Sequence, residues 1–404
     1  MTLCEDQHLG DFDVVVIGGG PAGATAASDL AKAGHSVLMV DREGRTKPCG
    51  GAIPTRAIRD FDLPNHLIKA KIGAARMISP TKKTVDMEIG DIGFVGMVDR
   101  DEFDPWLRQR AEADGADRFT GTFKTLARNS DGTVTCTITP KAANAEPVTA
   151  KARFVIGADG ANSIVRRDVF GTAKAPPYVF AYHEIIEAPA QTEEAAYDAD
   201  RCDVIYDGRV SPDFYGWIFP HGQQASIGCG SAHRDFSLKD ATSLIRKEAG
   251  LAEAKTIRRE GAPIPLKPMK RWDDGANVVL TGDAAGVVAP SSGEGIYYAM
   301  HTGRLCADSC REALATGKAA ALKTARKRFM KQHGRVFFIL GLLQRIWYNS
   351  DKRREQFVKM CRDDDVQRLT WESYLNKRLV KREPMAHLRV VVKDVRELLG
   401  FPAT

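Results

Sequence analysis

The sequence of 404 residues lacks the features that mark membrane-spanning, secreted and metal-binding proteins. Its eight cysteines form no C-x-x-C pair and no zinc-ligand spacing, so we expect reduced thiols and no metal site. The longest apolar stretch, 336–343, is interrupted by Gly341 and is far too short to span a membrane. The first 11 residues lack a basic start followed by an apolar segment, which predicts no secretory signal.

An excess of one charge is confined to the C-terminal end of the chain. From Lys318 to Thr404 there are 21 lysines and arginines against 9 acidic residues, whereas the remainder holds 37 against 43. This bias favours an anionic membrane surface or an acidic partner, and the alternative is a solvated helical face. We expect no nucleic-acid partner. The ordinary apolar fraction, 43%, and the length predict a globular protein with room for two domains.

A glycine-rich turn near the N-terminus carries the strongest pattern in the chain. The apolar run 12–17 predicts a buried strand, and Gly18, Gly20 and Gly23 follow it as G-x-G-x-x-G. Gly18 permits a tight turn, Gly20 lets a diphosphate approach the backbone, and Gly23 lets helix and strand pack closely. N–H groups at the start of the following helix attract the phosphate charge.

A second predicted strand, 35–40, ends at Asp41, whose carboxylate can accept hydrogen bonds from an adenosine ribose. Together with the glycine turn it predicts a dinucleotide site. These features alone leave NAD and FAD equally open.

The rest of the chain shows three kinds of pattern. Strands alternate with helices up to about residue 170, with Arg100 at the start of a helix over 99–113 and a loop over 42–54. Short strand-like pieces from 172 to about 271 predict a mostly antiparallel sheet and a second domain. Everything after Ala319 has a helical pattern.

Two further glycine motifs follow predicted strands. Gly-Ala-Asp-Gly at 157–160 ends the strand over 148–156. Gly282 and Asp283 follow the strand over 277–280 and lead, through a second glycine cluster, into an apolar helix that begins at Ile296.

In this order the three motifs resemble those of the FAD-dependent superfamily that includes aromatic hydroxylases, flavin halogenases and geranylgeranyl reductases. The resemblance implies FAD, with its ADP half at the first motif and its ribityl chain at Asp283. It also implies that the helix from Ile296 directs its N-terminus at the flavin ring, where N–H groups stabilise negative charge near N1. Asp41 is a departure, because many members carry glutamate there.

Four segments are similar to the geranylgeranyl reductases of chlorophyll and bacteriochlorophyll synthesis. They are KPCGGAIP at 47–54, PDFYGWIFP at 212–220, the segment 282–300, and WYNSDKRR at 347–354. The second matches the prenyl-reductase signature P-x-x-Y-x-W-x-F-P. The short loop between Asp41 and Cys49 is similar to that of the bacterial enzymes.

This resemblance implies an α/β fold with a glutathione-reductase-like Rossmann FAD domain, an antiparallel β substrate domain and a helical C-terminal region. We expect the FAD domain at 1–80, 98–170 and 274–318, the substrate domain at 81–97 and 171–273, and the basic helical region at 319–404. The expected cofactor-binding residues are Gly18, Gly20, Pro21, Ala22, Gly23, Asp41, Arg42, Cys49, Gly50, Gly51, Ala52, Arg100, Asp159, Gly282, Asp283, Gly293, Glu294, Gly295 and Ile296.

The implied activity is stepwise reduction of a geranylgeranyl chain to phytyl, with tightly bound FAD and transient NADPH. Because no second G-x-G-x-x-G exists, we expect NADPH to bind without a Rossmann site of its own. The substrate is geranylgeranyl-(bacterio)chlorophyll, geranylgeranyl diphosphate, or both. The implied location is cytoplasmic, peripheral on the photosynthetic intracytoplasmic membrane.

Two groups of residues have a functional and a structural interpretation. Cys49 is the candidate catalytic residue, a thiol near the flavin that assists protonation, and the alternative is a small residue packed in a glycine turn. Tyr215, Trp217 and Phe219 alternate on one strand face and are the candidate wall of a prenyl pocket; core packing is the alternative. His221 and His301 are lone candidates for proton transfer, and we expect neither to act.

Two rival functions stay open. A flavin hydroxylase or halogenase would use the same fold, although halogenases resemble W-x-W-x-I-P where this chain has YGWIFP. A non-catalytic prenyl carrier, similar to the Rab escort proteins, has little use for an intact Gly-Asp motif.

The C-terminal segment also predicts an interfacial helix. Its basic flanks are Arg335, Arg345, Lys352, Arg353 and Arg354. Its expected apolar side is Val336, Phe337, Ile339, Leu340, Leu343, Ile346 and Trp347. The competing interpretation is that these apolar residues close a prenyl tunnel.

Overall fold

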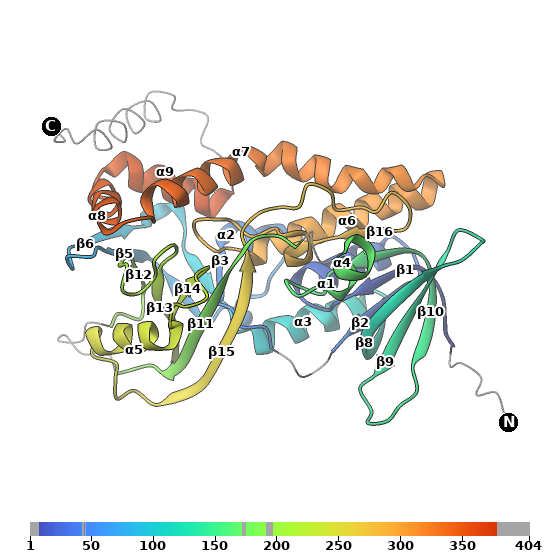
Figure 1. The fold of residues 1–404 in the computed structure, drawn as a ribbon, viewed down its shortest axis with the longest axis horizontal. Helices are drawn as coiled ribbons and strands as arrows, with labels where there is room; N and C mark the ends of the chain where they lie inside the picture. Colours follow the sequence, from blue (N-terminus) through green and yellow to red (C-terminus); the bar gives the residue numbers. More distant parts are fainter. Residues whose placement is uncertain (1–7, 43, 45, 172–174, 191–196, 378–404) are drawn as a thin grey trace. The chain divides into compact units, whose positions relative to one another are not determined.

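The N-terminal apolar run forms the centre of a parallel sheet, as predicted. The computed structural model describes residues 8–42, 44, 46–171, 175–190 and 197–377 (Figure 1). In it β1 (His8–Ile17) runs parallel to β2 (Val37–Asp41) on one side and to β10 (Val148–Gly157) on the other. Val14, Val15 and Val16 are fully buried, which explains why the run is apolar at successive positions.

Two more strands extend the parallel part of this sheet. β8 (Asp117–Arg128) pairs with β2, and β16 (Val278–Leu280) pairs with β10. Beyond its parallel part β8 continues into an antiparallel arm with β9 (Val134–Pro140) and the first half of β10. Figure 1 shows these three long strands together. The sequence patterns did not predict β8 as a strand, because its residues alternate only weakly between buried and exposed positions.

Helices and 3-10 turns belong to the same unit as this sheet, which comprises residues 1–47, 100–178 and 263–337. They are α1 (Pro21–Lys32), α3 (Arg100–Ala113), α4 (Ile164–Phe170), α6 (Ile296–Thr316), the 3-10 turns η4 (Gly282–Ala285) and η5 (Ala319–Leu322), and the first part of α7 (Lys323–Trp347). α1 and α6 touch at Gly303, where a Cβ atom would lie 2.2 Å from the carbonyl oxygen of Ala22. This contact fixes two of the helices that carry the glycine motifs.

The second unit, residues 48–99, 179–262 and 338–404, contains the expected antiparallel sheet. Its strand order is β15-β11-β14-β13-β12-β5-β6. The bounds are β15 (Thr256–Pro265), β11 (Tyr178–Glu187), β14 (Gln224–Ser231), β13 (Gly216–His221), β12 (Arg201–Ile205), β5 (Ala74–Ile78) and β6 (Thr84–Glu88). Only the pairing of β12 with β5 is parallel among those described.

One face of this sheet packs on α5 (Leu238–Glu248). Ile218 on β13 and Ile227 on β14 point into that core, where they meet Ile245 of the helix. Because side chains alternate along a strand, the residues on either side of Ile218 in β13 point to the opposite face. That opposite face carries Trp217 and Phe219, the predicted substrate residues.

Smaller elements complete the second unit. A three-stranded sheet contains β3 (Ala52–Pro54), β7 (Val95–Met97) and β4 (Ala70–Ile72). The unit also contains α2 (Thr55–Asp60), η1 (Asn65–Leu67), η2 (Gly90–Ile92), α8 (Asp351–Met360) and α9 (Asp364–Asn376). The expected loop over 42–54 is therefore wrong at its end, because residues 52–54 pair with β7.

The two units divide the chain at residues other than the expected domain boundaries. Residues 48–80, assigned to the FAD domain, lie in the second unit, and 319–404 is divided after Phe337. Units are defined by packing and functional domains by what they bind, so the expected domain assignment stays a prediction. The helical pattern after Ala319 is confirmed as far as 376, and the part from 378 onward lies outside the described residues.

The predicted apolar side of the C-terminal helix is wrong in two places. Phe337 is buried against Tyr298 and Phe329, with ring centroids 4.9 and 5.2 Å away, and Trp347 is buried near Phe357. The large apolar side chains that α7 does expose are Phe338, Ile339 and Leu342. Arg354, expected as a surface flank, is buried. Among the described helices none is long and apolar enough to cross a membrane.

Candidate functional site

The first glycine motif forms a backbone cradle at the end of β1. Gly18 has φ +111°, and a Cβ atom there would lie 2.4 Å from the carbonyl oxygen of Ala158. At Gly23 a Cβ atom would lie 1.8 Å from the carbonyl oxygen of Gly18, whereas at Gly20 it would meet no atom within 4 Å. Gly18 and Gly23 are thus required by packing, and Gly20 leaves open space beside the backbone.

Main-chain donors line that open space. Gly20 precedes α1 without a side-chain cap, and Pro21 is the first helical residue. Within the described part of the chain, no acceptor is found for the N–H groups of Gly20, Ala22 and Gly23. Free donors at a helix start suit a phosphate group, so this cradle fits the diphosphate of a dinucleotide.

Asp41, the predicted ribose acceptor, ends β2 next to this cradle. Its carboxylate forms an ion pair with Arg108 of α3 at 3.2 Å. Arg108 also donates to the carbonyl oxygen of Gly19 at 3.4 Å, so it holds the turn and the acid together. Arg108 was not predicted, because nothing in the helical pattern of 99–113 distinguishes it from other arginines. Arg42 is exposed.

Asp283, the predicted ribityl ligand, is buried in η4 and bonded to Lys47 through one carboxylate oxygen. Gly282 has φ +57°, and its N–H donates to the hydroxyl of Thr302 at 3.1 Å. A Cβ atom at Gly282 would lie 3.0 Å from that of Ala22 in α1. The Gly-Asp motif and the first glycine motif therefore lie against each other, although about 260 residues of chain separate them.

The helix start after the last glycines has both free donors and a local acid. Gly295 precedes α6 without a side-chain cap, and in the described part of the chain no acceptor is found for its N–H or for that of Ile296. The carboxylate of Glu294 accepts from the N–H of Tyr297 at 2.8 Å. Gly293 adopts φ +66° and donates to the carbonyl oxygen of Ala289. Two donors thus remain for a ligand.

Asp159 has a structural role that the sequence analysis did not assign to it. Its carboxylate accepts from the N–H groups of Ile164 and Val165, at 2.6 and 3.1 Å, and from the hydroxyl of Ser163. These bonds cap α4. Burial raises the pKa of Asp159, and the hydrogen bonds do not reverse the shift. Its role as a cofactor ligand stays a prediction.

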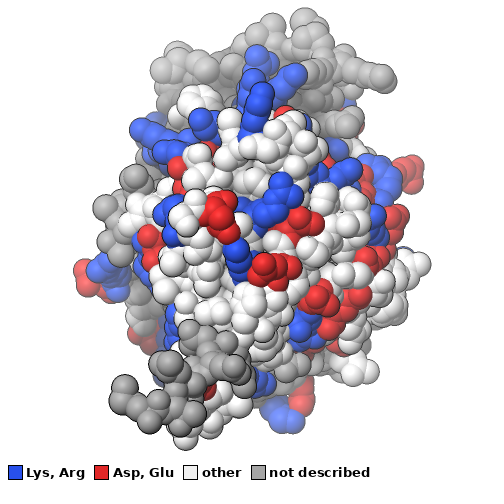
Figure 2. Space-filling model, turned by 90° about the vertical axis from the view of Figure 1, so that its right-hand side faces the viewer, with Lys and Arg blue, Asp and Glu red and all other residues white. Residues whose placement is uncertain are grey.

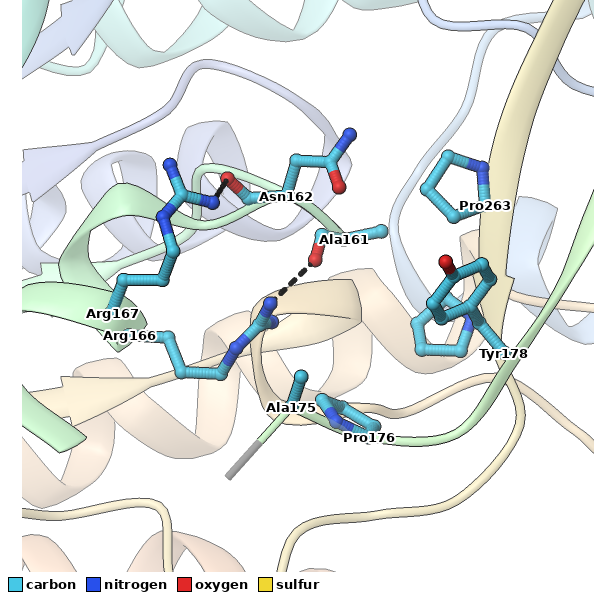
Figure 3. A pocket seen from close by; sticks show the side chains of 9 residues that line it. Ala161, Asn162, Arg166, Arg167, Ala175, Pro176, Tyr178 and Pro263 are labelled. Atoms are coloured by element: carbon cyan, nitrogen blue, oxygen red, sulfur yellow. Dashed lines mark hydrogen bonds between the residues drawn. The ribbon is translucent and has the colours of Figure 1, made fainter. Parts of the chain in front are cut away.

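A small cavity of about 180 Å³ lies beside this loop (Figure 3). Arg166 and Arg167 border it on one side, and Tyr178 and Pro263 on the other. Arg166 donates to the carbonyl oxygens of Ala161 and Ala284, and Arg167 to that of Asn162. Both arginines therefore hold the turn that follows the motif at 157–160, and Arg166 connects it to η4.

Arg100, another predicted cofactor residue of this unit, has a buried side chain. It forms a two-pronged ion pair with Asp104, one turn further along α3, at 2.6 and 2.7 Å. This pair neutralises the guanidinium charge within the helix. Its predicted contact with the cofactor stays a prediction.

In the second unit the predicted substrate residues form one aromatic row. Tyr215 and Trp217 are 7% and 5% exposed, and ring centroids along the row from Tyr215 to Trp217 to Phe219 are 6.0 Å apart. Opposite Trp217 on β14 is Gly228, where a Cβ atom would lie 2.6 Å from the indole. The missing side chain lets the indole lean over β14, where its Nε1 donates to the hydroxyl of Ser226 at 3.1 Å.

The prenyl-reductase signature and the C-terminal segment 347–354 meet in this unit. Arg354 donates to the carbonyl oxygens of Pro212 and Tyr348, and it pairs with Asp351 at 2.6 Å. The Tyr348 ring lies 5.2 Å from that of Tyr206, which in turn contacts Tyr215. The buried Arg354 thus fixes the start of the aromatic row.

Cys49 differs from the other described cysteines in being partly exposed. Burial raises the pKa of Cys136, Cys229 and Cys306 to about 12, so these thiols stay protonated at neutral pH. The sulfur of Cys49 accepts from the N–H of Gly51 at 3.4 Å. A Cβ atom at Gly50 would lie 3.2 Å from the ring of Phe219, so the Cys49 loop borders the aromatic row. Ala52 begins β3.

A FAD-binding domain family matches residues 11–331. The chain is 57% identical to the geranylgeranyl diphosphate reductase of Rhodobacter capsulatus, over 96% of this chain and 98% of that protein. It is 36% identical to the geranylgeranyl diphosphate reductase of Synechocystis, over 96% and 97%. A solved structure of a geranylgeranyl bacteriochlorophyll reductase-like protein from Thermoplasma acidophilum matches with a TM-score of 0.76, at 23% identity, over 96% and 98%.

These matches place the chain in the FAD-binding domain family, and the solved structure confirms the predicted α/β fold. Within that family the chain belongs to the geranylgeranyl reductases. The resemblance drawn from the motifs is thereby confirmed.

Proposed function

We propose that this chain is an FAD-dependent reductase that saturates carbon–carbon double bonds of a geranylgeranyl group, stepwise, to phytyl. The full-length likeness to geranylgeranyl diphosphate reductases carries the proposal. The substrate is geranylgeranyl-(bacterio)chlorophyll, geranylgeranyl diphosphate, or both. NADPH is the reductant and binds transiently, because the chain has no second G-x-G-x-x-G.

The first unit has the donors that FAD requires. The N–H groups of Gly20, Ala22 and Gly23 would hold the diphosphate, and Asp41 the adenosine ribose. Lys47 bonds to one carboxylate oxygen of Asp283, and the second oxygen would accept from a ribityl hydroxyl. When bound, FAD supplies hydride transfer.

The second unit has the surface that a prenyl chain requires. The row of Tyr215, Trp217 and the partly exposed Phe219 offers rigid aromatic area beside a strand that carries Gly228 and Ser226. An apolar chain gains by leaving water for such a surface, at about 25 cal/mol per Å². The isolated alkenes of the substrate have no carbonyl to accept electron density, so one carbon must receive a proton as the other receives hydride. Cys49 is the proposed proton donor.

Anaerobic turnover with NADPH and each of the two substrates, followed by mass analysis, tests the proposal. We expect products heavier by two hydrogens per reduced bond, and no such products from Asp283→Ala protein stripped of FAD. Hydroxylated product with peroxide release in air would instead identify a monooxygenase. Protein that binds the substrate but carries no flavin absorbance would identify a prenyl carrier.

The exposed stripe of α7 supports a peripheral membrane location. Phe338 is 73% and Leu342 47% exposed, and Arg335 and Arg345 follow the same stripe at helical spacing, both exposed. Figure 2 shows both charges interspersed over the face it presents, with basic side chains prevailing toward its upper edge. Basic residues contribute about 1 kcal/mol each near an anionic leaflet, and salt weakens that attraction.

Flotation with anionic and neutral liposomes tests this location. We expect binding to anionic vesicles at low salt, and its loss on Phe338→Glu with Leu342→Glu. Phe337 is buried, so it serves no purpose as a target. Binding that ignores lipid charge and salt, or no binding, would rule out electrostatic docking. The basic residues after 377 lie outside the described residues, and deleting them separates their contribution from that of α7.

A further inference from the structure

His221 connects a partly buried acid, Asp99, to the loop that carries Cys49. The ring follows Phe219 on the same face of β13 and is 7% exposed. Its Nδ1 lies 2.8 Å from a carboxylate oxygen of Asp99, and its Nε2 lies 3.1 Å from the carbonyl oxygen of Gly50. Asp99 lies two residues after the end of β7, the strand that pairs with β3, so the three residues come from separate parts of the second unit.

The two partners determine where the protons of the ring are. A carbonyl oxygen only accepts, and so does an ionised carboxylate, so both ring nitrogens must donate. A histidine that donates from both nitrogens is an imidazolium. Burial alone would raise the pKa of Asp99, but the hydrogen bond and charge of His221, with the charges of Lys69 and Arg258, lower it overall. Asp99 is therefore ionised and balances the imidazolium.

The peptide group between Gly50 and Gly51 passes this interaction on to Cys49. Its carbonyl oxygen accepts from His221, and its N–H donates to the sulfur of Cys49 at 3.4 Å. A peptide whose oxygen accepts from a cation becomes a stronger donor at its nitrogen, because hydrogen bonds in a chain polarise one another. The positive charge at His221 is thus felt at the sulfur through one peptide group.

The loop has little freedom to leave this arrangement. Gly51 has φ +72°, and a Cβ atom there would lie 2.5 Å from Cε1 of His221 and 2.4 Å from the carbonyl oxygen of Val98. The N–H of Val98 donates to the carbonyl oxygen of Gly51 at 2.9 Å. His221 holds the carbonyl oxygen of the Gly50–Gly51 peptide and Val98 holds the peptide that follows it, so the Gly51 N–H keeps its direction toward the sulfur.

We propose that His221 is a positioning residue that, paired with Asp99, stabilises the thiolate of Cys49 through the Gly50–Gly51 peptide. The proposal rests on the proposed function in giving Cys49 the role of proton donor. In that step the S–H bond breaks, a C–H bond forms at one alkene carbon, and the other alkene carbon receives the hydride. The negative charge left on sulfur is stabilised by the Gly51 N–H until the thiolate takes a proton from water.

The reactivity of Cys49 toward iodoacetamide tests the proposal without geranylgeranyl substrate. FAD-loaded protein is alkylated across pH 6–10, and the modification of the Cys49 peptide is followed by mass spectrometry. We expect His221→Gln to slow alkylation near pH 7.5 by about tenfold and to move the pH profile upward, since a neutral amide no longer polarises the peptide. Asp99→Asn should slow it less. His233→Gln, at an exposed position in the same unit, should match the parent protein.

The half-reactions distinguish this role from a structural one. His221→Gln and Asp99→Asn should keep flavin content and reduction by NADPH, while alkene reduction falls with the alkylation rate. Folded variants with the parent's alkylation profile would overturn the proposal. If His221→Gln does not fold, Asp99→Asn decides, because it removes the counter-charge and keeps the ring. Failure of alkene reduction in the parent with a shifted alkylation profile in the variants would overturn the proposed function and leave the His221 inference standing.

Discussion

The two units build their sites from different parts of the chain. In the first unit the proposed cofactor-binding groups include main-chain donors, such as the N–H groups of Gly20 and Gly23, and glycines make room for them. In the second unit the proposed site consists of side chains, such as Trp217 and His221 on β13, whose polar atoms are bonded to other protein groups. A main-chain site therefore depends on the path of the backbone, and a side-chain site depends on the hydrogen-bond partners that hold each side chain.

The largest effect should come from breaking the shape of the first unit. Gly23→Ala places a Cβ atom 1.8 Å from a carbonyl oxygen, and we expect loss of flavin together with at least 2–3 kcal/mol of stability. Gly20→Ala is the matched control, because its Cβ meets no protein atom. Without FAD, the Gly20→Ala protein should be as stable as the parent, but its affinity for FAD should be lower by about tenfold or more. Urea unfolding measures the stability and flavin titration the FAD affinity. Equal stabilities of the Gly23→Ala and Gly20→Ala proteins would contradict the different roles of the two glycines.

Asp283→Ala should remove FAD from a protein that still folds. A ribityl hydroxyl loses a charged acceptor, which corresponds to about 1.5–3 kcal/mol of binding, and Lys47 loses its partner. Flavin absorbance after gel filtration gives the occupancy. Lys47→Ala separates the two contributions, since it leaves the carboxylate in place. Full flavin occupancy in Asp283→Ala would refute the assignment of this residue.

Trp217→Ala should slow alkene reduction and leave the reduction of the flavin by NADPH unchanged. Removing the buried indole costs on the order of 2–4 kcal/mol of contact, so alkene reduction should fall while NADPH still reduces the flavin. Trp217→Phe keeps an aromatic ring and loses the bond to Ser226, which should cost about 1 kcal/mol. Stopped-flow absorbance follows each half-reaction. An equal fall in both would make Trp217 a core residue.

Cys49 variants sharpen the role of its loop. Cys49→Ser keeps a donor of similar size, and Cys49→Ala removes it. We expect alkene reduction to be clearly slower in the alanine variant than in the serine variant, with unchanged FAD affinity. Single-turnover reduction of the substrate by pre-reduced enzyme measures the difference. Near-parent rates for both variants would leave Cys49 with a packing role only.

The smallest effect is the pH dependence of the second unit. Burial alone would raise the pKa of Glu184, but hydrogen bonds from Arg246, Tyr182 and Arg259 lower it below 4.5 overall. A carboxyl whose pKa is lower in the folded state contributes stability at neutral pH, and that contribution is lost as the pH falls through the folded pKa. Glu184→Gln should therefore destabilise at pH 7, and its difference from the parent should shrink as the pH falls below 4.5 toward the folded pKa. Urea unfolding at several pH values checks this, and a constant difference would contradict it.

Much of the fold was open to prediction because burial imposes periodic patterns. The strands at 12–17 and 148–156, the helix from Ile296 and the antiparallel sheet are all confirmed. The end of the 42–54 segment was missed because a three-residue strand has too few positions to show alternation. The exposed side of α7 was misjudged because Phe337 and Phe338 are equally apolar, and only packing against Tyr298 decides which is buried.

The sequence by itself determined the dinucleotide cradle and the family, because main-chain sites need particular residues at fixed spacing along the chain. Only the tertiary structure decided which side chains bond to one another in the two sites. It brings Arg108 to Asp41, and it brings His221 and Asp99 to the Cys49 loop. Such contacts join residues that are distant in sequence and leave no spacing to detect. A side chain is aimed by the strand or helix that carries it, and those elements meet only when the chain packs.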